Sequence, residues 1–272
     1  MTIDYLVCIV KKSKAEVIKI IEKLGLTGNI LVGNQLMESE SIAEIEFNNS
    51  HITIYNLTTT GVSKNRNFLL NKSTADYITF IDDDGVVFDG AQKKAEDFIL
   101  NHEYNCVRFN VVSKNNNRQI KQLNKKGFVG FKSLSSFGVW GIFFKRQFLL
   151  DKRITFREDI GPGTDINHGE DGIFLKEITK ITKIYSCTEV LFSFDQFEST
   201  WQGANRNLEN ELVSHGYVYS ILYPKCTFLA AKLYLVTHMW YYPKHTSILK
   251  LYKWMKIGIL KEKKRPIDVL KS

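Results

Sequence analysis

The stretch that decides the fold is YITFIDDDGVVFD, residues 77–89, in which an apolar run leads into three consecutive aspartates and a glycine. The apolar run, Tyr77–Ile81, predicts a buried strand. Asp82, Asp83 and Asp84 then lie at the carboxyl end of that strand, where open α/β sheets bind ligands. Adjacent carboxylates repel one another, so the pattern favours a divalent cation whose coordination shell a phosphate-bearing ligand completes. The alternative is an acidic strand-to-helix turn in which Asp89 or Asp84 only caps the next helix.

Short apolar strands alternate with helical patterns on both sides of this stretch. We expect strands over Tyr5–Val10, Asn29–Val32, His51–Asn56, Tyr77–Ile81 and Tyr104–Val111, and helices over Lys14–Leu24, Lys64–Asn71 and Gly90–Asn101. This order predicts an α/β fold with a Rossmann-like, mostly parallel and doubly wound central sheet. Residues 205–222 and 226–260 also have helical patterns. We therefore expect a catalytic domain over residues 1–204 and a helical C-terminal extension over residues 205–272.

The charge of the chain is unevenly distributed. The net charge is +8, but residues 1–222 carry 26 Lys and Arg against 27 Asp and Glu, a net of −1. Residues 223–272 carry 11 Lys and Arg against 2 Asp and Glu, a net of +9. This asymmetry argues against a general nucleic-acid-binding protein and favours a basic tail with its own anionic partner.

The cysteines and the N-terminus indicate the cellular compartment. Cys8, Cys106, Cys187 and Cys226 are far apart and form no CxxC pair, which favours buried thiols over a disulfide framework. The first residues, MTIDYLVCIVKKSK, lack the pattern of a signal peptide. We therefore expect a cytoplasmic location.

A second acidic block follows at residues 156–178, with the sequence FREDIGPGTDINHGEDGIFLKEI. Its glycine-rich turn precedes Glu170 and Asp171, and the apolar spacing after them predicts a helix. The two carboxylates then lie in the first helical turn, where the helix dipole keeps an anion ionised and usable as a base. The alternative is that these acids only stabilise the helix N-terminus.

The two blocks together resemble the family 2 glycosyltransferases of the GT-A fold, and in particular bacterial enzymes that build capsule, exopolysaccharide or O-antigen. The resemblance rests on GVSKNRNFLLNKSTADYITFIDDDGVVF, residues 61–88, followed by FREDIGPGTDINHGEDGIFL, and spans about residues 1–200. In that family an Arg-Asn helix precedes a strand that ends in a DxD-type motif. A glycine-rich loop and a Glu-Asp pair follow in the same order.

The resemblance assigns roles to the acidic triplet. Asp82 and Asp84 match the DxD carboxylates, which contact the nucleotide ribose and hold Mn²⁺ or Mg²⁺ on the diphosphate of the donor. The resemblance implies that Asp84 is the direct metal ligand, with Asp82 as a second ligand. Asp83 is implied to belong to the same nucleotide-binding network.

Five further residues receive roles from the same resemblance. Arg66 and Asn67 match the Arg-Asn helix and are implied to lie near the nucleotide. Asp171 matches the general base, with Glu170 beside it toward the acceptor. Thr200 resembles a residue close to the diphosphate.

The chain departs from the family pattern in two places. The first strand runs into CIVKKSK, where the family usually has a turn like Pro-Thr-Tyr-Asn. The second strand offers Asn34 in VGNQ, where the family often has an acid that reads the base. An asparagine amide can still pair with a uracil edge. The family resemblance implies UDP as the nucleotide. His168 is expected to be a solvated loop residue and no metal ligand.

These assignments predict a metal-dependent, inverting glycosyltransferase of bacterial surface polysaccharide synthesis. It would move a sugar from a nucleotide-diphosphate sugar to a hydroxyl of a glycan or lipid-linked acceptor. One base opposite one metal-stabilised leaving group implies a single displacement with inversion. One alternative is a haloacid-dehalogenase-type, Mg²⁺-dependent phosphatase with Asp82 as nucleophile and Asp84 as acid/base, although that motif normally lies on the first strand. A non-catalytic metal- or sugar-binding module is the other alternative.

The basic tail predicts a contact with a membrane surface. Residues 226–242 are too short, and too interrupted by Lys232 and His238, for a membrane span. In SILKLYKWMKIGILKEKKR the lysines Lys250, Lys253, Lys261 and Lys264 share one side, and Leu249, Trp254, Met255, Ile257 and Ile259 supply apolar surface. Such a helix suits an anionic membrane interface, which predicts a peripheral location at the inner face of the cell membrane. The alternative is a helix packed on the core with its lysines solvated.

Overall fold

The structure is a computed structural model that describes residues 1–113, 122–134, 138–194, 207–242 and 246–264. In these residues one ten-stranded sheet has the order β3-β4-β2-β1-β5-β9-β7-β10-β6, and β8 pairs with β10 outside this path. The strands are β1 (Ile3–Val10), β2 (Gly28–Gln35), β3 (Ser41–Phe47), β4 (Ser50–Asn56), β5 (Tyr77–Asp82), β6 (Gly85–Val87), β7 (Cys106–Ser113), β8 (Gly127–Val129), β9 (Ile142–Lys145) and β10 (Ile184–Phe194). The β4-β2-β1-β5 block is parallel, as is the β7-β10 pair, which confirms the expected mostly parallel sheet.

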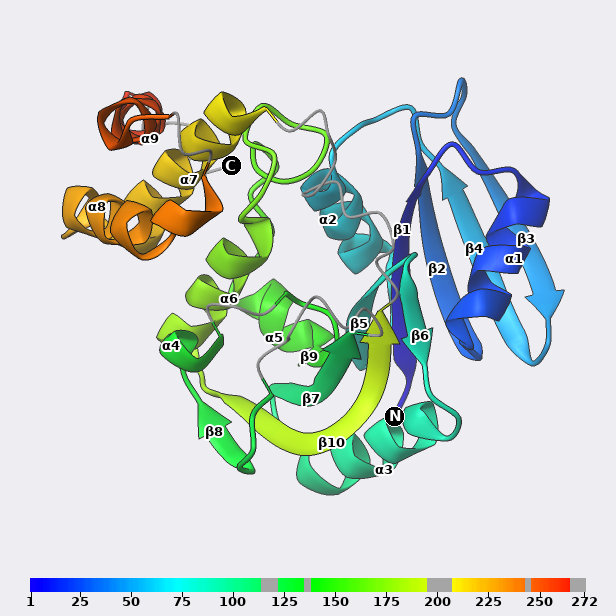
Figure 1. Ribbon diagram of the computed structural model, residues 1–272. Helices are drawn as coiled ribbons and strands as arrows, with labels where there is room; N and C mark the ends of the chain where they lie inside the picture. Colours follow the sequence, from blue (N-terminus) through cyan, green and yellow to red (C-terminus); the bar gives the residue numbers. More distant parts are fainter. Residues whose placement is uncertain (114–121, 135–137, 195–206, 243–245, 265–272) are drawn as a thin grey trace.

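Helices cover both faces of this sheet, and Figure 1 shows the C-terminal helices gathered at one end. They are α1 (Lys14–Leu24), α2 (Val62–Lys72), α3 (Ala91–His102), α4 (Phe131–Leu134), α5 (Arg146–Asp151), α6 (Glu170–Ile181), α7 (Leu208–Leu222), α8 (Thr227–Thr237), the 3₁₀ turn η1 (Met239–Tyr241) and α9 (Ile248–Lys263). α1 and α3 contribute to the hydrophobic core on one face, and α2, α5 and α6 contribute to the core on the other. The chain therefore has the α/β architecture that the sequence predicts.

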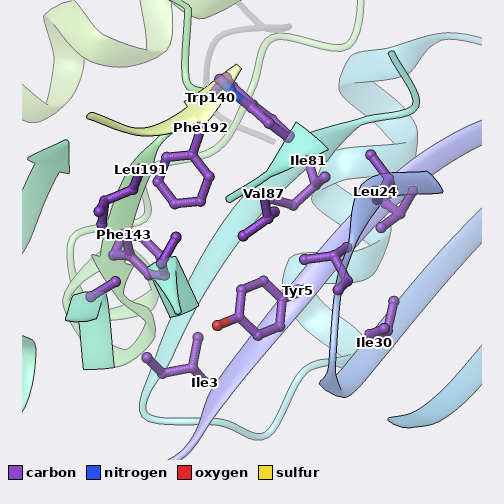
Figure 2. Close-up of a cluster of buried hydrophobic side chains, with 14 of the residues drawn as sticks. Ile3, Tyr5, Leu24, Ile30, Ile81, Val87, Trp140, Phe143, Leu191 and Phe192 are labelled. Carbon is purple, nitrogen blue, oxygen red and sulfur yellow. The ribbon is translucent and has the colours of Figure 1, made fainter. Parts of the chain in front are cut away.

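The central strands are buried on both sides, which explains their nearly continuous apolar sequences. Along β1, Tyr5 and Val7 point into one core and Leu6 into the other, and all three are at most 1% exposed. Figure 2 shows Tyr5 within the first core, together with Ile81 of β5 and Phe143 of β9. A strand with two buried faces holds its carboxyl end in a fixed position, and β1 and β5 both end at the candidate site.

The sequence did not predict several strands of the second half and one at the sheet edge. β3 is an edge strand that pairs antiparallel with β4 through a tight turn at Asn48 and Asn49, whose φ angles are +45° and +59°. β6, β8 and β9 have only three or four residues, too few to show a periodicity. β9 runs antiparallel between β5 and β7, and β6 runs antiparallel to β10.

The C-terminal extension is a layer of helices in which α7 and α9 cross in close contact. A Cβ atom on Gly216 of α7 would lie 1.9 Å from the carbonyl oxygen of Met255, and one on Gly258 of α9 would lie 1.9 Å from that of Val213. Glycines at the crossing therefore let the two backbones touch. The expected helix over 226–260 is divided into α8 and α9, with η1 and Ser247, the N-cap of α9, between them.

The same layer is joined to the catalytic half of the chain. Tyr217 and Val218 of α7 form a small apolar cluster with Ile160, Ile166 and Ile173, which lie in the loop before α6 and in α6 itself. No helix in the part of the chain that the structure describes is long and apolar enough to cross a membrane.

Candidate functional site

A cavity of about 650 Å³ lies at the carboxyl ends of β1 and β5, the edge of the sheet at which ligands were expected. Its wall is formed by Cys8 of β1, the start of α2, the acidic turn after β5, the loop that leads into α6, and α7. In the sheet Cys8 is directly opposite Asp82, the last residue of β5. The cavity therefore joins the two acidic blocks, which are more than 80 residues apart in sequence.

The acidic triplet forms the turn between β5 and β6. Asp82 ends the strand with a side chain that is 49% exposed, and Asp83 and Asp84 make the turn itself. All three line the cavity. Desolvation, and then the neighbouring charge of Asp82, raise the pKa of Asp83. Like charges held this closely favour the arrival of a cation or of a proton.

Gly85 fixes this turn against Trp140. A Cβ atom on Gly85 would lie 2.1 Å from the Trp140 ring, so only glycine fits here without movement. Trp140 is 9% exposed and packs edge-on against Phe192 at a centroid distance of 5.8 Å, as Figure 2 shows. The ring therefore has little freedom to move, and the acidic turn rests on a rigid aromatic wall.

Replacing Gly85 with Ala should therefore destabilise the chain and disturb the acidic turn. We expect a loss of about 1–3 kcal/mol in the free energy of unfolding, because overpacking forces the ring or the turn to shift. Urea denaturation measures this loss. Gly130→Ala is the matched control, since Gly130 is exposed and a Cβ there meets nothing within 4 Å. Equal stability of the two variants would contradict the proposed contact.

Arg66 of α2 connects the acidic turn to the Glu-Asp pair. Its Nη2 donates to Asp82 Oδ1 at 3.1 Å, and its Nη1 donates to Asp171 Oδ1 at 2.5 Å. The same Nη1 lies 3.5 Å from Glu170 Oε1. The Arg66 side chain is only 4% exposed, and its guanidinium lies 5.2 Å from the centre of the Phe156 ring. Burial alone lowers the pKa of Arg66, but the three carboxylates raise it overall, so the guanidinium stays charged.

The start of α2 is anchored to the glycine-rich loop, which positions Arg66. Ser63 Oγ donates to the carbonyl oxygen of Ile160 at 2.5 Å, and the Val62 backbone N–H donates to that of Pro162 at 3.0 Å. One turn further along, the Asn67 side chain donates to the Phe156 carbonyl oxygen and accepts from the Phe156 N–H, at 2.9 and 2.8 Å. Asn67 was expected near the nucleotide. Its amide instead holds the loop that leads to α6.

Glu170 and Asp171 lie in the first turn of α6, as the sequence predicts. Burial, and then the charge of Asp171, raise the pKa of Glu170 to about 7, against the opposing effect of Arg66. Burial also raises the pKa of Asp171, although Arg66 and the Val139 N–H, 3.3 Å from Oδ2, favour its ionised form. The Asp171 side chain is 23% exposed toward the cavity. It is thus a partly accessible carboxylate with a raised pKa, the combination that suits a general base.

His168 is buried, so the expectation of a solvated loop residue was wrong. It is 7% exposed, and its Nε2 lies 3.1 Å from Nδ1 of His215 on α7. Tyr234 Oη of α8 lies 2.9 Å from His215 Nε2, and His168 Nδ1 lies 2.9 Å from Asn167 Oδ1. His215 and Tyr234 are 47 and 66 residues downstream of His168, so the sequence around His168 gives no sign of them. The hydrogen bonds connect the loop before Glu170 to both α7 and α8.

Burial, and then the neighbouring His215, lower the pKa of His168 to about 3. Below the ordinary histidine pKa of about 6.5, the unfolded chain takes up a proton that the folded chain refuses, so stability falls as the pH falls from about 6.5 toward 3. Between pH 7 and pH 5 this site should account for up to about 2 kcal/mol of lost unfolding free energy. Urea denaturation at pH 7 and pH 5 measures this decrease in unfolding free energy. The decrease should be smaller in His168→Gln than in the wild type. In His102→Gln, a change at an exposed position, it should equal that of the wild type. The same loss in His168→Gln as in the wild type would refute this origin.

Asn34 is buried behind the backbone of Lys12. Its Oδ1 accepts from the Lys12 N–H at 3.0 Å, and its Nδ2 donates to the Lys12 carbonyl oxygen at 2.7 Å and to Asn56 Oδ1 at 2.8 Å. The amide expected to pair with a base is therefore fully engaged inside the protein. It shapes a second cavity of about 640 Å³ at the ends of β1, β2 and β4, lined in part by Lys11 and Lys12. Thr200 lies outside the described residues.

Asp82 and Asp84, the metal ligands that the sequence resemblance implies, both line this cavity. No group of three His, Cys, Asp or Glu side chains that could hold a metal occurs among the residues that the structure describes. Two carboxylates are nevertheless a fitting set for Mg²⁺ or Mn²⁺ on a diphosphate, since such ions bind through one or two carboxylates and keep substrate and water oxygens. Asp82 Oδ1 accepts from Arg66 Nη2 at 3.1 Å, and Asp84 lines the same cavity in the turn that follows.

Comparisons with known proteins agree with this geometry. Among solved structures, a fragment (1–349) of S. aureus TarS in complex with UDP-GlcNAc is similar at a TM-score of 0.66 and 14% identity, over 94% of this chain and 79% of that one. The same fragment in complex with UDP is similar at a TM-score of 0.61 and 14% identity, over 93% of this chain and 78% of that one. A longer TarS structure is similar at a TM-score of 0.64 and 13% identity, over 99% of this chain and 50% of that one. These likenesses establish a shared GT-A fold.

A comparison with curated protein sequences gives no match. The family model described as "Glycosyl transferase family 2" matches residues 11–162, more than half of the chain. That range contains the α2 arginine, Arg66, and the acidic turn at Asp82–Asp84. The chain is therefore a member of glycosyl transferase family 2, with the GT-A fold.

Proposed function

We propose that the chain is a metal-dependent, inverting glycosyltransferase that moves a sugar from a UDP-sugar to a hydroxyl of a glycan or lipid-linked acceptor. The single observation that carries the proposal is the Arg66 network. One buried guanidinium pairs with Asp82 at the end of β5 and with Asp171 in the first turn of α6, and both carboxylates line the same cavity. Arg66 would thereby hold a diphosphate-binding acid and a base in fixed positions, as transfer by single displacement requires.

The donor would lie along the carboxyl edge of the sheet. The second cavity, beside Lys11 and Lys12, has room for the nucleoside, and the turn at Asp83 and Asp84 adjoins the diphosphate. A divalent cation held by Asp84 and Asp82 would supply positive charge that stabilises the leaving diphosphate. UDP is the nucleotide we propose, and the TarS structures with UDP and UDP-GlcNAc support that choice.

The acceptor would enter from the α7 side of the cavity, between Asp171 and His215. Asp171 would accept the proton of the acceptor hydroxyl while the oxygen attacks the anomeric carbon. The bond between that carbon and the diphosphate oxygen breaks as the new bond forms. Attack from the face opposite the leaving group inverts the configuration. Glu170, with a pKa near 7, would orient the acceptor through a hydrogen bond.

The acceptor we propose belongs to bacterial surface polysaccharide synthesis, either as a growing glycan or as a lipid-linked intermediate at the inner face of the cell membrane. The basic C-terminal region supports this choice, since it suits an anionic membrane surface. The phosphatase alternative finds no support, because β5 is preceded by four strands and Asp82, its nucleophile, is paired with Arg66.

The test is a donor panel. Purified protein is incubated with UDP-, dTDP-, GDP- and CMP-sugars and with Mn²⁺, Mg²⁺ or EDTA, and the released nucleotide is measured. We expect release from a UDP-sugar in the presence of metal, and an inverted anomeric configuration of the product by NMR. Release of phosphate from p-nitrophenyl phosphate, or retention of configuration, would refute the proposal.

A further inference from the structure

Exposed apolar side chains concentrate on α8 and η1. Leu229, Leu233 and Val236 are 68%, 61% and 60% exposed, and Met239 and Trp240 are 55% and 82% exposed. We name these five residues the α8 patch. The spacing of four and three residues places Leu229, Leu233 and Val236 along one side of α8, and Met239 and Trp240 follow in η1.

The opposite side of α8 is already packed. Ala231 and Leu235 are at most 1% exposed and belong to the cluster that joins α8 to α7 and α9. α8 thus has one apolar side that is packed and a second apolar side that faces outward beside Lys232. Single exposed apolar residues are ordinary on a protein surface, whereas a contiguous group marks a site of interaction.

α9, the helix expected to lie on a membrane, has a different role. Met255 and Ile259 were counted as its apolar contact surface, but both are fully buried against the rest of the helical layer. The close crossing at Gly216 and Gly258 explains why. α9 instead contributes charge, since Lys250, Lys253, Lys256 and Lys261 are exposed.

Lysines border the α8 patch on the same layer. Lys263 of α9 lies with its Nζ 4.9 Å from the ring centre of Phe228 in the first turn of α8. Lys232 of α8 lies with its Nζ 5.7 Å from the ring centre of Tyr252. In the described residues after 222, eight lysines stand against one glutamate, Glu262. An apolar patch with basic surroundings complements an anionic, amphipathic surface.

We infer that α8 and η1 dock the protein on an anionic phospholipid bilayer, with the α8 patch in the headgroup–acyl boundary and the lysines at the lipid phosphates. Trp240 and Tyr241, at the end of the patch, are of the residue types enriched at that depth. A second copy of this chain is a poorer occupant, because a self-paired interface would bring the two sets of lysines together.

This inference rests on the proposed function in one respect, the lipid-linked acceptor that the membrane would present. It also gives that acceptor a route to the site. Tyr234 on the same helix is bonded to His215, and His215 to His168 beside the base, so the docking helix and the catalytic loop belong to one hydrogen-bonded unit.

The test compares vesicle binding of the full chain and of the double variant Leu233→Ser/Trp240→Ser. Both positions are exposed, so folding should be preserved, which circular dichroism checks. We expect the wild type to co-sediment with vesicles that contain phosphatidylglycerol, and weakly with pure phosphatidylcholine. The double variant should bind the anionic vesicles at least tenfold more weakly. Ile42→Ser, a matched change at a position 65% exposed on the edge strand β3, should bind like the wild type.

Thermal stabilisation by a UDP-sugar with Mn²⁺ should be equal in all three proteins, which separates this inference from the proposed function. Equal vesicle binding of the double variant and Ile42→Ser would overturn the inference. The inference would also be overturned if the wild type bound no vesicles and sedimented as a dimer while the double variant sedimented as a monomer. The α8 patch would then be an interface between copies of the chain.

Discussion

Replacing Asp171 with Asn should lower the rate of sugar transfer by about 10²–10⁴-fold, the contribution typical of a general base. The amide keeps the size of the side chain and one oxygen for Arg66, but it cannot accept the proton of the acceptor hydroxyl. Donor affinity should change by no more than a few-fold, because Asp171 is not among the residues proposed to bind the donor and the amide keeps its contact with Arg66. Nucleotide release at saturating acceptor gives the rate, and calorimetric titration of the UDP-sugar gives the affinity.

Asp165→Asn is the matched control for this variant. Its carboxylate is 90% exposed and pairs only with Lys261 at 3.3 Å among the contacts described, so its loss should leave the rate unchanged. A rate for Asp171→Asn that stays close to that of the wild type would show that the base lies elsewhere.

Replacing Arg66 with Met should destabilise the fold by about 3–5 kcal/mol, the usual result of removing one partner from a buried ion pair. The change leaves the Asp82, Glu170 and Asp171 carboxylates facing one another without their shared cation. The loss should be smaller at pH 5 than at pH 8, because at the lower pH protons can neutralise the carboxylates. Urea denaturation at both pH values measures the two losses.

Arg157→Met provides the comparison for Arg66. Arg157 also pairs with a carboxylate, Asp159 at 3.0 Å, but its side chain is 18% exposed rather than 4%. Its removal should cost about 1 kcal/mol or less, as is typical of ion pairs near the surface. If the two variants lost equal stability, Arg66 would not be the organising charge of the site.

The sequence was most informative where local chemistry decides the structure. The run of apolar residues from Tyr77 to Ile81 predicted β5 because a strand buried on both faces needs such a sequence. The glycine before Glu170 and the apolar spacing after it predicted the start of α6. The order of these elements also predicted the α/β fold. In each case the signal lies within about ten neighbouring residues.

The parts that the sequence did not predict depend on contacts between distant residues. Trp140 lies against Gly85 although 55 positions separate them, and nothing near Gly85 indicates an aromatic wall. Asn34 was expected to pair with a base and Asn67 to lie near the nucleotide. Their amides are hydrogen-bonded to the backbones of Lys12 and Phe156, and a sequence cannot show such contacts. The apolar side of α9 was expected to meet lipid. Met255 and Ile259 on that side are buried in the helical layer instead, because glycines on α7 and α9 permit a close crossing, whereas Leu249 and Ile257 are exposed.

The central claim, that the acidic turn binds the diphosphate of a UDP-sugar through a metal, is tested most directly by thermal denaturation with a UDP-sugar and Mn²⁺. At a ligand concentration of about 100 times Kd, the wild type should gain about 2.7 kcal/mol of unfolding free energy. EDTA should abolish this gain. Asp84→Asn should lose it, whereas Asp89→Asn, at an exposed position outside the cavity, should keep it. Metal-dependent stabilisation that persists in Asp84→Asn would contradict the claim.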